Sequence, residues 1–166
     1  MEGAVGSLRK RQRADGSFPG FWGINLTYAT FFAVEGLRAA GVDHDDAGLR
    51  RAAEWLAGKQ RPDGGWGEHF TSCLRGEYVE HTESQVAMTS WALLTLLESW
   101  PGHSQAIERG IEWLSARQEA SGSWPDQSAN GVCFGSAMLD YRLYKTYFPT
   151  WALARRSRVA VDRRSA

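Results

Sequence analysis

The strongest constraint on the fold is a short motif that this 166-residue chain contains three times. Segments 51–66 and 109–124 align without gaps, and each reads Trp-Leu, then Gln, then Gly-x-Trp. Segment 8–18 is a degraded copy. It keeps the distance from the Gln to the last aromatic, but that aromatic is a phenylalanine and the upstream tryptophan is absent. Repeats of this kind indicate stacked structural units that share one core.

Each copy of the motif predicts a local staple at the end of a helix. The helix would end at Trp-Leu-x3-Gln, and a glycine turn with positive φ would carry the last tryptophan back over that end. The Gln amide could bond backbone groups left unpaired at the following helix end, while the indole ring covers them. The residues expected in this structural role are Gln12, Phe18, Trp55, Gln60, Trp66, Trp113, Gln118 and Trp124.

Four of the eight tryptophans belong to this motif, in a chain whose tryptophan content is several times ordinary usage. Trp22, Trp91 and Trp151 lie in other segments, and Trp100 has no assigned role. The excess therefore has an architectural part and a part that suggests an aromatic-lined site.

Helical periodicity dominates the segments between the copies of the motif. No stretch alternates convincingly like a strand, so we expect an all-α chain of helix pairs, arranged as an α-α solenoid or toroid. The expected helices cover 26–40, ended by Gly41; a segment capped by Asp45 or Asp46; 83–99, ended by Pro101; a segment capped by Ser104; 134–147; and 150–156.

Charge and cysteine content exclude several classes of protein. Lysines and arginines number 19 and acidic residues 19, and a net charge of zero argues against a nucleic-acid partner. Cys73 and Cys133 are too few for a disulfide scaffold and lack CxxC spacing, which favours a reduced cytoplasmic setting. The N-terminus lacks the features of a signal peptide, and no apolar run reaches the ~18 residues that a membrane span needs.

The last residues form a small basic tail. It could contact anionic lipid at a membrane surface or a protein partner, or it could be a solvated terminus without function. Its arginines are Arg155, Arg156, Arg158, Arg163 and Arg164.

Several segments of the sequence resemble motifs of one known family. The repeats resemble the QW motifs of the class II triterpene cyclases, the family of squalene-hopene and oxidosqualene cyclases, and three further stretches support it in the family's order. Segment 15–30 is similar to DGSW-x-G-x-WGV-x-x-TYGT, segment 84–93 to SQ-x-x-x-T-x-WA, and segment 130–153 to the C-terminus of the oxidosqualene branch, which includes the lanosterol and cycloartenol synthases.

The resemblance implies a fold and a reaction. The fold would be part of an α-α barrel, as in terpenoid cyclases and protein prenyltransferases, with a squalene-cyclase C-terminal-like domain over 1–156 and the basic tail over 157–166. The family reaction cyclises 2,3-epoxysqualene or squalene to a sterol- or hopanoid-type polycycle and needs no cofactor. Such chemistry requires an acid in a dry pocket and ring faces that stabilise carbocations without offering a nucleophile.

The resemblance also implies cavity residues. Trp22 and Tyr28 match aromatic positions of the family's WGV and TYG stretch, and Tyr141 and Tyr144 match its paired C-terminal tyrosines, three apart on one expected helix face. Each could line the cavity or be buried structure. The family's phenylalanine in the GVF stretch corresponds to Cys133, with Phe134 one position later, and its next cysteine corresponds to Ala137, which puts the aromatic cage at this end in doubt.

No residue of the chain is expected to act as the catalytic acid. The string Asp43-His44-Asp45-Asp46 fits the family's DxDD motif, but the family's acid lies well upstream of the stretch matched by Trp22. Clustered aspartates here are better explained as the cap of the following helix. A metal site from the loose cluster of His69, Cys73, His81 and Glu83 is also disfavoured, because the usual ligand spacing is absent.

These observations predict a piece of a triterpene cyclase. The chain would supply part of the cavity wall to a linear triterpene, once completed by an upstream half that carries the acid. The alternative is a non-catalytic helical-repeat module that binds lipid or a protein partner.

Overall fold

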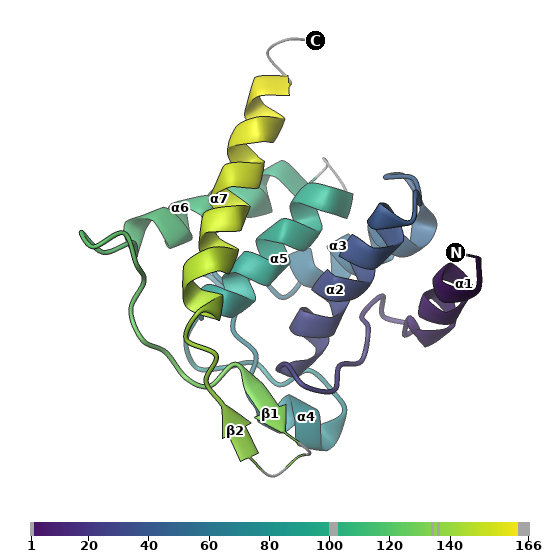
Figure 1. Cartoon of the computed structure of the whole chain (residues 1–166), viewed down its shortest axis with the longest axis horizontal. Coiled ribbons are helices and arrows are strands. Elements are labelled where there is room, and N and C mark those ends of the chain that lie inside the picture. Colours follow the sequence, from purple (N-terminus) through teal and green to yellow (C-terminus); the bar gives the residue numbers. More distant parts are fainter. Residues whose placement is uncertain (1, 100–102, 134, 136, 163–166) are drawn as a thin grey trace.

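The fold is mostly helical, in agreement with the sequence-based expectation (Figure 1). We describe it from a computed structural model, which covers residues 2–99, 103–133, 135 and 137–162. Trp100, Phe134, Arg163 and Arg164 lie outside the described residues. The elements are α1 (Glu2–Arg11), α2 (Asn25–Ala39), α3 (Ala47–Ala57), α4 (Thr71–Arg75), α5 (Val86–Ser99), α6 (Ser104–Ala116), β1 (Gly131–Cys133), β2 (Ala137–Leu139) and α7 (Tyr144–Asp162).

Helix α5 is the centre of the core. Almost all of its residues are buried, on every side of the helix. A helix that is apolar all round needs neighbours all round, and α2, α3, α6 and α7 pack against it. Figure 1 shows α5 between α7 and α2, with α1 at one end of the molecule and the turn after α6 at the other. The expected segment 83–99 therefore forms a helix, although its first turn begins at Val86.

The helix starts are held by different devices. Asp46 caps α3 as predicted, because its side chain accepts hydrogen bonds from the amides of Gly48, at 2.8 Å, and Leu49, at 3.3 Å. The predicted Ser104 cap is wrong. Ser104 is the first residue of α6, and His103 precedes it without a side-chain capping bond.

The expectation of a helix over 134–147 is wrong for residues 137–139, which form β2, and among the described residues of that segment only 144–147 are helical, as the first turn of α7. The expectation that the chain has no strand is wrong as well. Strands β1 and β2 form an antiparallel hairpin in which Val132 pairs with Met138. The backbone of β1 also bonds the segment before α2: the Val132 amide donates to the Trp22 carbonyl at 2.9 Å, and the Ile24 amide donates to the Asn130 carbonyl at 3.1 Å. These backbone hydrogen bonds to a distant segment stabilise the strand conformation of residues 131–133, and the local helical propensity of the following residues does not prevent it.

The last helix is longer than the predicted 150–156 and crosses the boundary expected at 156. Helix α7 runs through Pro149, which removes one backbone donor. Its neighbours Phe148 and Ala152 are buried in the main core, and this packing holds the helix against α5.

Part of the expected basic tail is tied to the fold. Arg155 forms ion pairs with Glu35 of α2 and, at 3.0 Å, with Glu98 of α5. The guanidinium of Arg156 donates to Glu108 of α6, from Nε at 3.0 Å. These two arginines fix α7 to three other helices. Within the described residues, no helix is both long enough and apolar enough to cross a membrane.

Candidate functional site

Aromatic side chains from α2, α5, the start of α7 and the loop before α7 form one contacting group, which we call the aromatic cluster. Each ring contacts at least one other ring of the group, with centroids 4.4–6.3 Å apart. Its members are Tyr28, Phe31, Phe32, Trp91, Tyr141, Tyr144, Tyr147, Phe148 and Trp151.

The aromatic cluster has a buried floor. Phe31, Trp91 and Phe148 are at most 3% exposed. Trp91 meets the ring of Tyr28 at 5.3 Å and that of Tyr144 at 5.6 Å, both close to perpendicular. Edge-to-face pairs of this kind are a favoured aromatic geometry, so the floor fixes the orientation of the two tyrosines.

Four other rings of the aromatic cluster lie at the surface. Phe32, Tyr141, Tyr147 and Trp151 are each between 38% and 47% exposed. Contiguous exposed aromatic surface is unusual on a soluble protein and marks a binding or interaction site. An open aromatic face on a rigid floor is suited to a large apolar ligand.

The structure brings three of the predicted cavity residues together: Tyr28, Tyr141 and Tyr144. Tyr141 and Tyr144 stack with centroids 4.9 Å apart and an interplanar angle of 22°. The expectation that they share a helix face is wrong, because Tyr141 precedes α7. The Asn130 side chain places Tyr141 instead: its Oδ1 accepts from the Tyr141 amide at 3.2 Å, and its Nδ2 donates to the Tyr141 carbonyl at 3.3 Å.

Trp22 is 44% exposed, and its ring packs edge-to-face on Phe21, with centroids 5.7 Å apart. The next residue, Gly23, packs so closely under Tyr28 that a Cβ built on it would lie 2.1 Å from the ring. Only glycine fits there. Cys133 ends β1 and is half-buried, while the neighbouring Phe134, named with it as a cavity candidate, lies outside the described residues.

Tyr28, Tyr144 and Tyr147 of the aromatic cluster have raised pKa values. Burial, together with the neighbouring Tyr28, Tyr147 and Tyr141, raises the pKa of Tyr144 to about 12. Burial followed by proximity to Tyr141 raises the pKa of Tyr28, and burial followed by proximity to Tyr28 raises that of Tyr147. These groups stay neutral well above physiological pH, and therefore present no phenolate that could attack a cation.

Sequence reasoning missed Trp91 as a site residue. Its indole ring is fully buried and contacts three members of the aromatic cluster. Its Nε1 has no hydrogen-bond partner among the described residues. The stretch around Trp91 resembles a family segment, but no local pattern shows that rings from two other helices, α2 and α7, contact it.

The raised pKa of Tyr144 makes stability depend on alkaline pH. The unfolded chain releases this proton near pH 10, whereas the folded chain keeps it to about pH 12. The unfolded state therefore binds fewer protons in this interval, and stability should fall as the pH rises through it. Denaturant unfolding at pH 9 and pH 11 should show a larger loss for the wild type than for Tyr144→Phe, which cannot ionise. Equal losses would contradict this assignment.

Side chains of the repeats form hydrogen bonds at the helix ends. Trp66 Nε1 donates to the Leu56 carbonyl at 2.7 Å, and Trp124 Nε1 donates to the Leu114 carbonyl at 2.9 Å, so each indole covers the end of the preceding helix. Gln60 Nε2 donates to the carbonyl of its own glycine turn and, at 2.8 Å, to Ala106 in the first turn of α6. One Gln thus ties two successive repeats.

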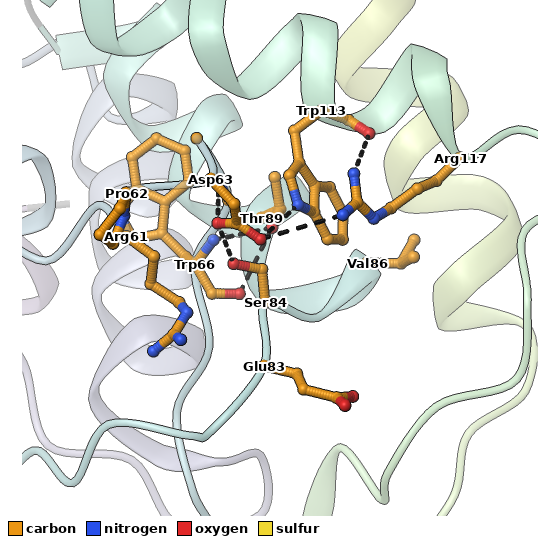
Figure 2. A network of polar contacts seen from close by, with 12 residues as sticks. Arg61, Pro62, Asp63, Trp66, Glu83, Ser84, Val86, Thr89, Trp113 and Arg117 are labelled. Atoms are coloured by element: carbon orange, nitrogen blue, oxygen red, sulfur yellow. Dashed lines mark hydrogen bonds and ion pairs between the residues drawn. The ribbon is translucent and has the colours of Figure 1, made fainter.

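A polar network reinforces the joint between the second and third repeats (Figure 2). One oxygen of Asp63 accepts from the hydroxyl of Ser84 at 2.6 Å, and the other accepts from Trp113 Nε1 at 2.9 Å. Arg117 lies over the Trp113 ring, 4.0 Å from its centroid. Burial alone would raise the pKa of Asp63, but the hydrogen bonds from Ser84, Trp113 and Gly65 and the charge of Arg117 outweigh it and lower the pKa.

This network borders an open polar hollow of about 450 Å³, lined in part by Arg61, Glu83 and Arg117. The carboxylate of Asp63 has its bonds within the joint, and Arg61 bonds Glu80 and the carbonyls of His81 and Thr82. We interpret the hollow as the outer surface of the repeat joint, and place the candidate site at the aromatic cluster.

The tie made by Gln60 should be measurable. Gln60→Ala leaves two partly buried carbonyls without this donor and should lower the free energy of unfolding by about 1–3 kcal/mol. Gln118→Ala is a matched control, since among the described residues Gln118 Nε2 donates only to the carbonyl of its own turn, at 3.0 Å, and is exposed. Chemical denaturation of both variants compares the two. A Gln118 loss as large as the Gln60 loss would refute the inter-repeat tie.

The aspartates of the DxDD-like string do not form an acid site. Asp43 and Asp45 are exposed. At Asp46 burial alone would raise the pKa, but bonds from Arg9 and from the amides of Leu49 and Gly48 lower it, so the carboxyl is ionised at neutral pH. A group that must protonate an epoxide or alkene needs a proton at working pH. These contacts make Asp46 the cap of α3, and its lowered pKa disfavours a role as proton donor.

The His69 and Cys73 cluster shows no metal geometry. Among the described residues, no group of three His, Cys, Asp or Glu side chains is placed to hold a metal ion. Burial, followed by the charge of Glu68, raises the pKa of the Cys73 thiol to about 11, which disfavours the thiolate that metals bind.

Comparisons with known proteins agree with these features. Residues 1–158 match the family model of the squalene-hopene cyclase C-terminal domain. The chain is 41% identical over 156 residues to lanosterol synthase of Aspergillus fumigatus, covering 93% of this chain and 21% of that protein. It is 42% identical over 154 residues to squalene-hopene cyclase of Bradyrhizobium diazoefficiens, covering 91% of this chain and 23% of that protein.

A solved structure shows the same fold. A type II terpene cyclase from Scytonema, in complex with merosterolic acid A as product, matches with a TM-score of 0.74 and 21% identity, over 92% of this chain and 48% of that one. The chain thus spans about a fifth to a quarter of the length of the curated relatives above, and about half of this solved chain.

Proposed function

Because the chain belongs to the family of squalene-hopene and oxidosqualene cyclases, we propose that its aromatic cluster is one wall of a cavity that receives a linear triterpene. The observation that carries the proposal is the shape of the aromatic cluster, with a buried floor and an open face. A triterpene chain is apolar and large, and an open aromatic face offers it contact area without polar groups that would need solvation.

The cluster also suits the intermediates of cyclisation. Ring faces attract positive charge through their quadrupoles, at about 0.5–2 kcal/mol for each good contact. Tyr28, Tyr144 and Tyr147 are neutral at physiological pH like ordinary tyrosines, and their raised pKa values move ionisation further away, so on this proposal they stabilise a carbocation without trapping it as phenolates would. We propose that Trp91 acts through Tyr28 and Tyr144 by fixing their ring orientation, and that Trp22 extends the same wall.

The proton donor is proposed to come from outside this chain. The DxDD-like string lies at the start of α3, where Asp46 is a cap. A carboxyl kept protonated in a dry pocket must therefore be supplied by another segment of a complete cyclase. On this proposal the chain contributes substrate binding and cation stabilisation, and the other segment starts the reaction.

A photoreactive squalene analogue tests the binding part. The full chain should be labelled at residues of the aromatic cluster, and Tyr144→Ala should reduce the labelling several-fold. Tyr78→Phe is a control, because Tyr78 packs against Trp55 on the α3 side. Labelling that is absent, or unchanged in Tyr144→Ala, would count against the cavity and favour a non-catalytic module.

Incubation of the chain alone with epoxysqualene tests the second part. We expect bound substrate and no cyclic product, since the initiating acid is assigned elsewhere. Cyclic product from the chain alone would show that this assignment is wrong.

A further inference from the structure

The same hydrogen-bond pattern joins the first repeat to the second and the second repeat to the third. We call each of these two contacts an occupied joint. Gln12 Nε2 donates to the Gly16 carbonyl at 3.0 Å and to the Gly48 carbonyl at 2.7 Å. Gln60 does the same with Gly64 and Ala106. Gly48 and Ala106 are equivalent positions in the first turns of α3 and α6, each twelve residues before its own repeat's Gln. Each Gln turn thus docks on the first turn of the next repeat's helix.

Glycine makes this docking close. A Cβ built on Gly16 would lie 2.3 Å from the Arg51 carbonyl oxygen, and one built on Gly64 would lie 2.7 Å from that of Arg109. Arg51 and Arg109 are again equivalent in the repeats. A backbone carbonyl of the incoming helix therefore rests directly on the glycine, and no side chain fits between them.

The third repeat has the same turn, but within the described residues no helix docks on it. Gly122 has a positive φ of 83°, like Gly16 and Gly64. A Cβ on Gly122 would nevertheless meet nothing within 4 Å. Gln118 is exposed, and its Nε2 donates to the Gly122 carbonyl without a second acceptor in the described part of the chain. We call residues 118–122 the open repeat edge. Figure 1 shows it projecting beyond α6.

The charge of the open repeat edge indicates what fits it. In the occupied joints an arginine of the incoming helix contacts the turn: Arg51 Nη2 donates to Gln12 Oε1 at 2.8 Å, and Arg109 Nη2 donates to the Pro62 carbonyl at 2.8 Å. The residue after the Gln is Arg13 or Arg61 in those turns, but Glu119 in the third. At the open repeat edge an incoming arginine would therefore find a glutamate next to the Gln, at the position where the other two repeats have an arginine.

We propose that the open repeat edge binds the first turn of an α-helix of the pattern Arg-x3-Trp-Leu, supplied by another repeat outside this chain. The Gln118 amide would donate to a first-turn carbonyl, Gly122 would receive the arginine's carbonyl, and the guanidinium would reach Gln118 and Glu119. A second copy of this chain is a poorer occupant, because the start of α1 carries Gly3 and Ser7 where the pattern has Arg and Trp. The inference rests on the repeats, and holds whether or not the chain binds a triterpene.

A labelled peptide with the sequence of residues 44–60 serves as the probe, because it contains the Asp46 cap, Arg51 and Trp55-Leu56. Fluorescence anisotropy with the full chain should give saturable binding. Gln118→Ala and Gly122→Val, which adds a side chain at the contact, should each weaken it about tenfold, and Glu119→Lys should do so most strongly at low salt. Gln12→Ala alters an occupied joint and should leave the affinity unchanged.

The variants lie on an exposed turn, and thermal melts followed by circular dichroism verify that each remains folded. Absence of saturable binding to the wild type would overturn the proposal. Binding to Gln118→Ala and to Gly122→Val that is as tight as binding to the wild type would overturn it as well, since the peptide would then be held elsewhere, for example on the aromatic cluster. A peptide with Arg51→Glu should bind worst to the wild type and regain affinity for Glu119→Lys.

Discussion

Replacing Glu68 with alanine is expected to lower the free energy of unfolding by about 3–6 kcal/mol, which is a large part of the stability of a domain of this size. Glu68 is fully buried. Its two carboxylate oxygens accept from the amides of Leu26, at 3.0 Å, and Thr27, at 2.8 Å. These are unpaired donors of the first turn of α2, whose own cap residue Ile24 has no side-chain acceptor. A negative charge is also favoured at this end of the helix dipole.

Loss of Glu68 would leave two buried amides without an acceptor and would release the start of α2, which carries Tyr28. Glu68→Gln should be intermediate, since one acceptor oxygen remains. Glu77→Ala is the control, because Glu77 is exposed in the loop after α4 and its loss should change stability by less than about 0.5 kcal/mol. Urea unfolding of the three variants measures the differences. A Glu68→Ala protein as stable as Glu77→Ala would contradict the assigned role.

Trp66→Ala is expected to have the second large effect, about 3–5 kcal/mol. The Trp66 ring is completely buried among α3, α5 and α6. Its removal would open a cavity, and it would also leave the Leu56 carbonyl at the end of α3 without the indole donor. The staple and the core would be lost in one substitution.

Trp22→Ala provides the matched comparison, because Trp22 is half-exposed and belongs to the proposed cavity wall. It should cost little stability but weaken labelling by a squalene analogue. Trp66→Ala should lower stability strongly. At a low temperature at which this variant is still folded, it should be labelled by the squalene analogue as efficiently as the wild type. Thermal melts and photolabelling of both variants separate the two roles. Similar losses of stability in both variants would contradict the division of the tryptophans into staples and wall.

The helical repeat was predictable because its signals are local. The glycine turns, the Gln and Trp spacing and the Asp46 cap each act within a few residues, and the structure places them as expected. Helices α2, α3, α5 and α6 follow from apolar periodicity, with ends that shift by a few residues. Predicting each turn did not require knowledge of how the repeats pack together, because the residues of one motif determine the conformation of its turn.

The rest depends on contacts between distant segments. The β1–β2 hairpin is fixed by backbone bonds to Trp22 and Ile24, more than 100 residues earlier. Glu68 caps a helix that begins some 40 residues before it. Trp91 became the floor of the site because α2 and α7 meet on α5. Patterns within a short stretch of sequence do not show contacts between distant segments. The β1–β2 hairpin, the capping of α2 by Glu68 and the role of Trp91 in the aromatic cluster were therefore not predicted.

The central claim is that the aromatic cluster favours a positively charged polyene. The direct test uses a squalene analogue in which an ammonium group stands at the position of a carbocation. Its affinity for the full chain is measured by competition with the photoreactive analogue. An uncharged hydrocarbon of the same shape is measured in the same way for comparison. Cation–π contacts of about 0.5–2 kcal/mol predict that the ammonium analogue binds roughly 2- to 30-fold more tightly. Equal or weaker binding of the ammonium analogue would contradict the account.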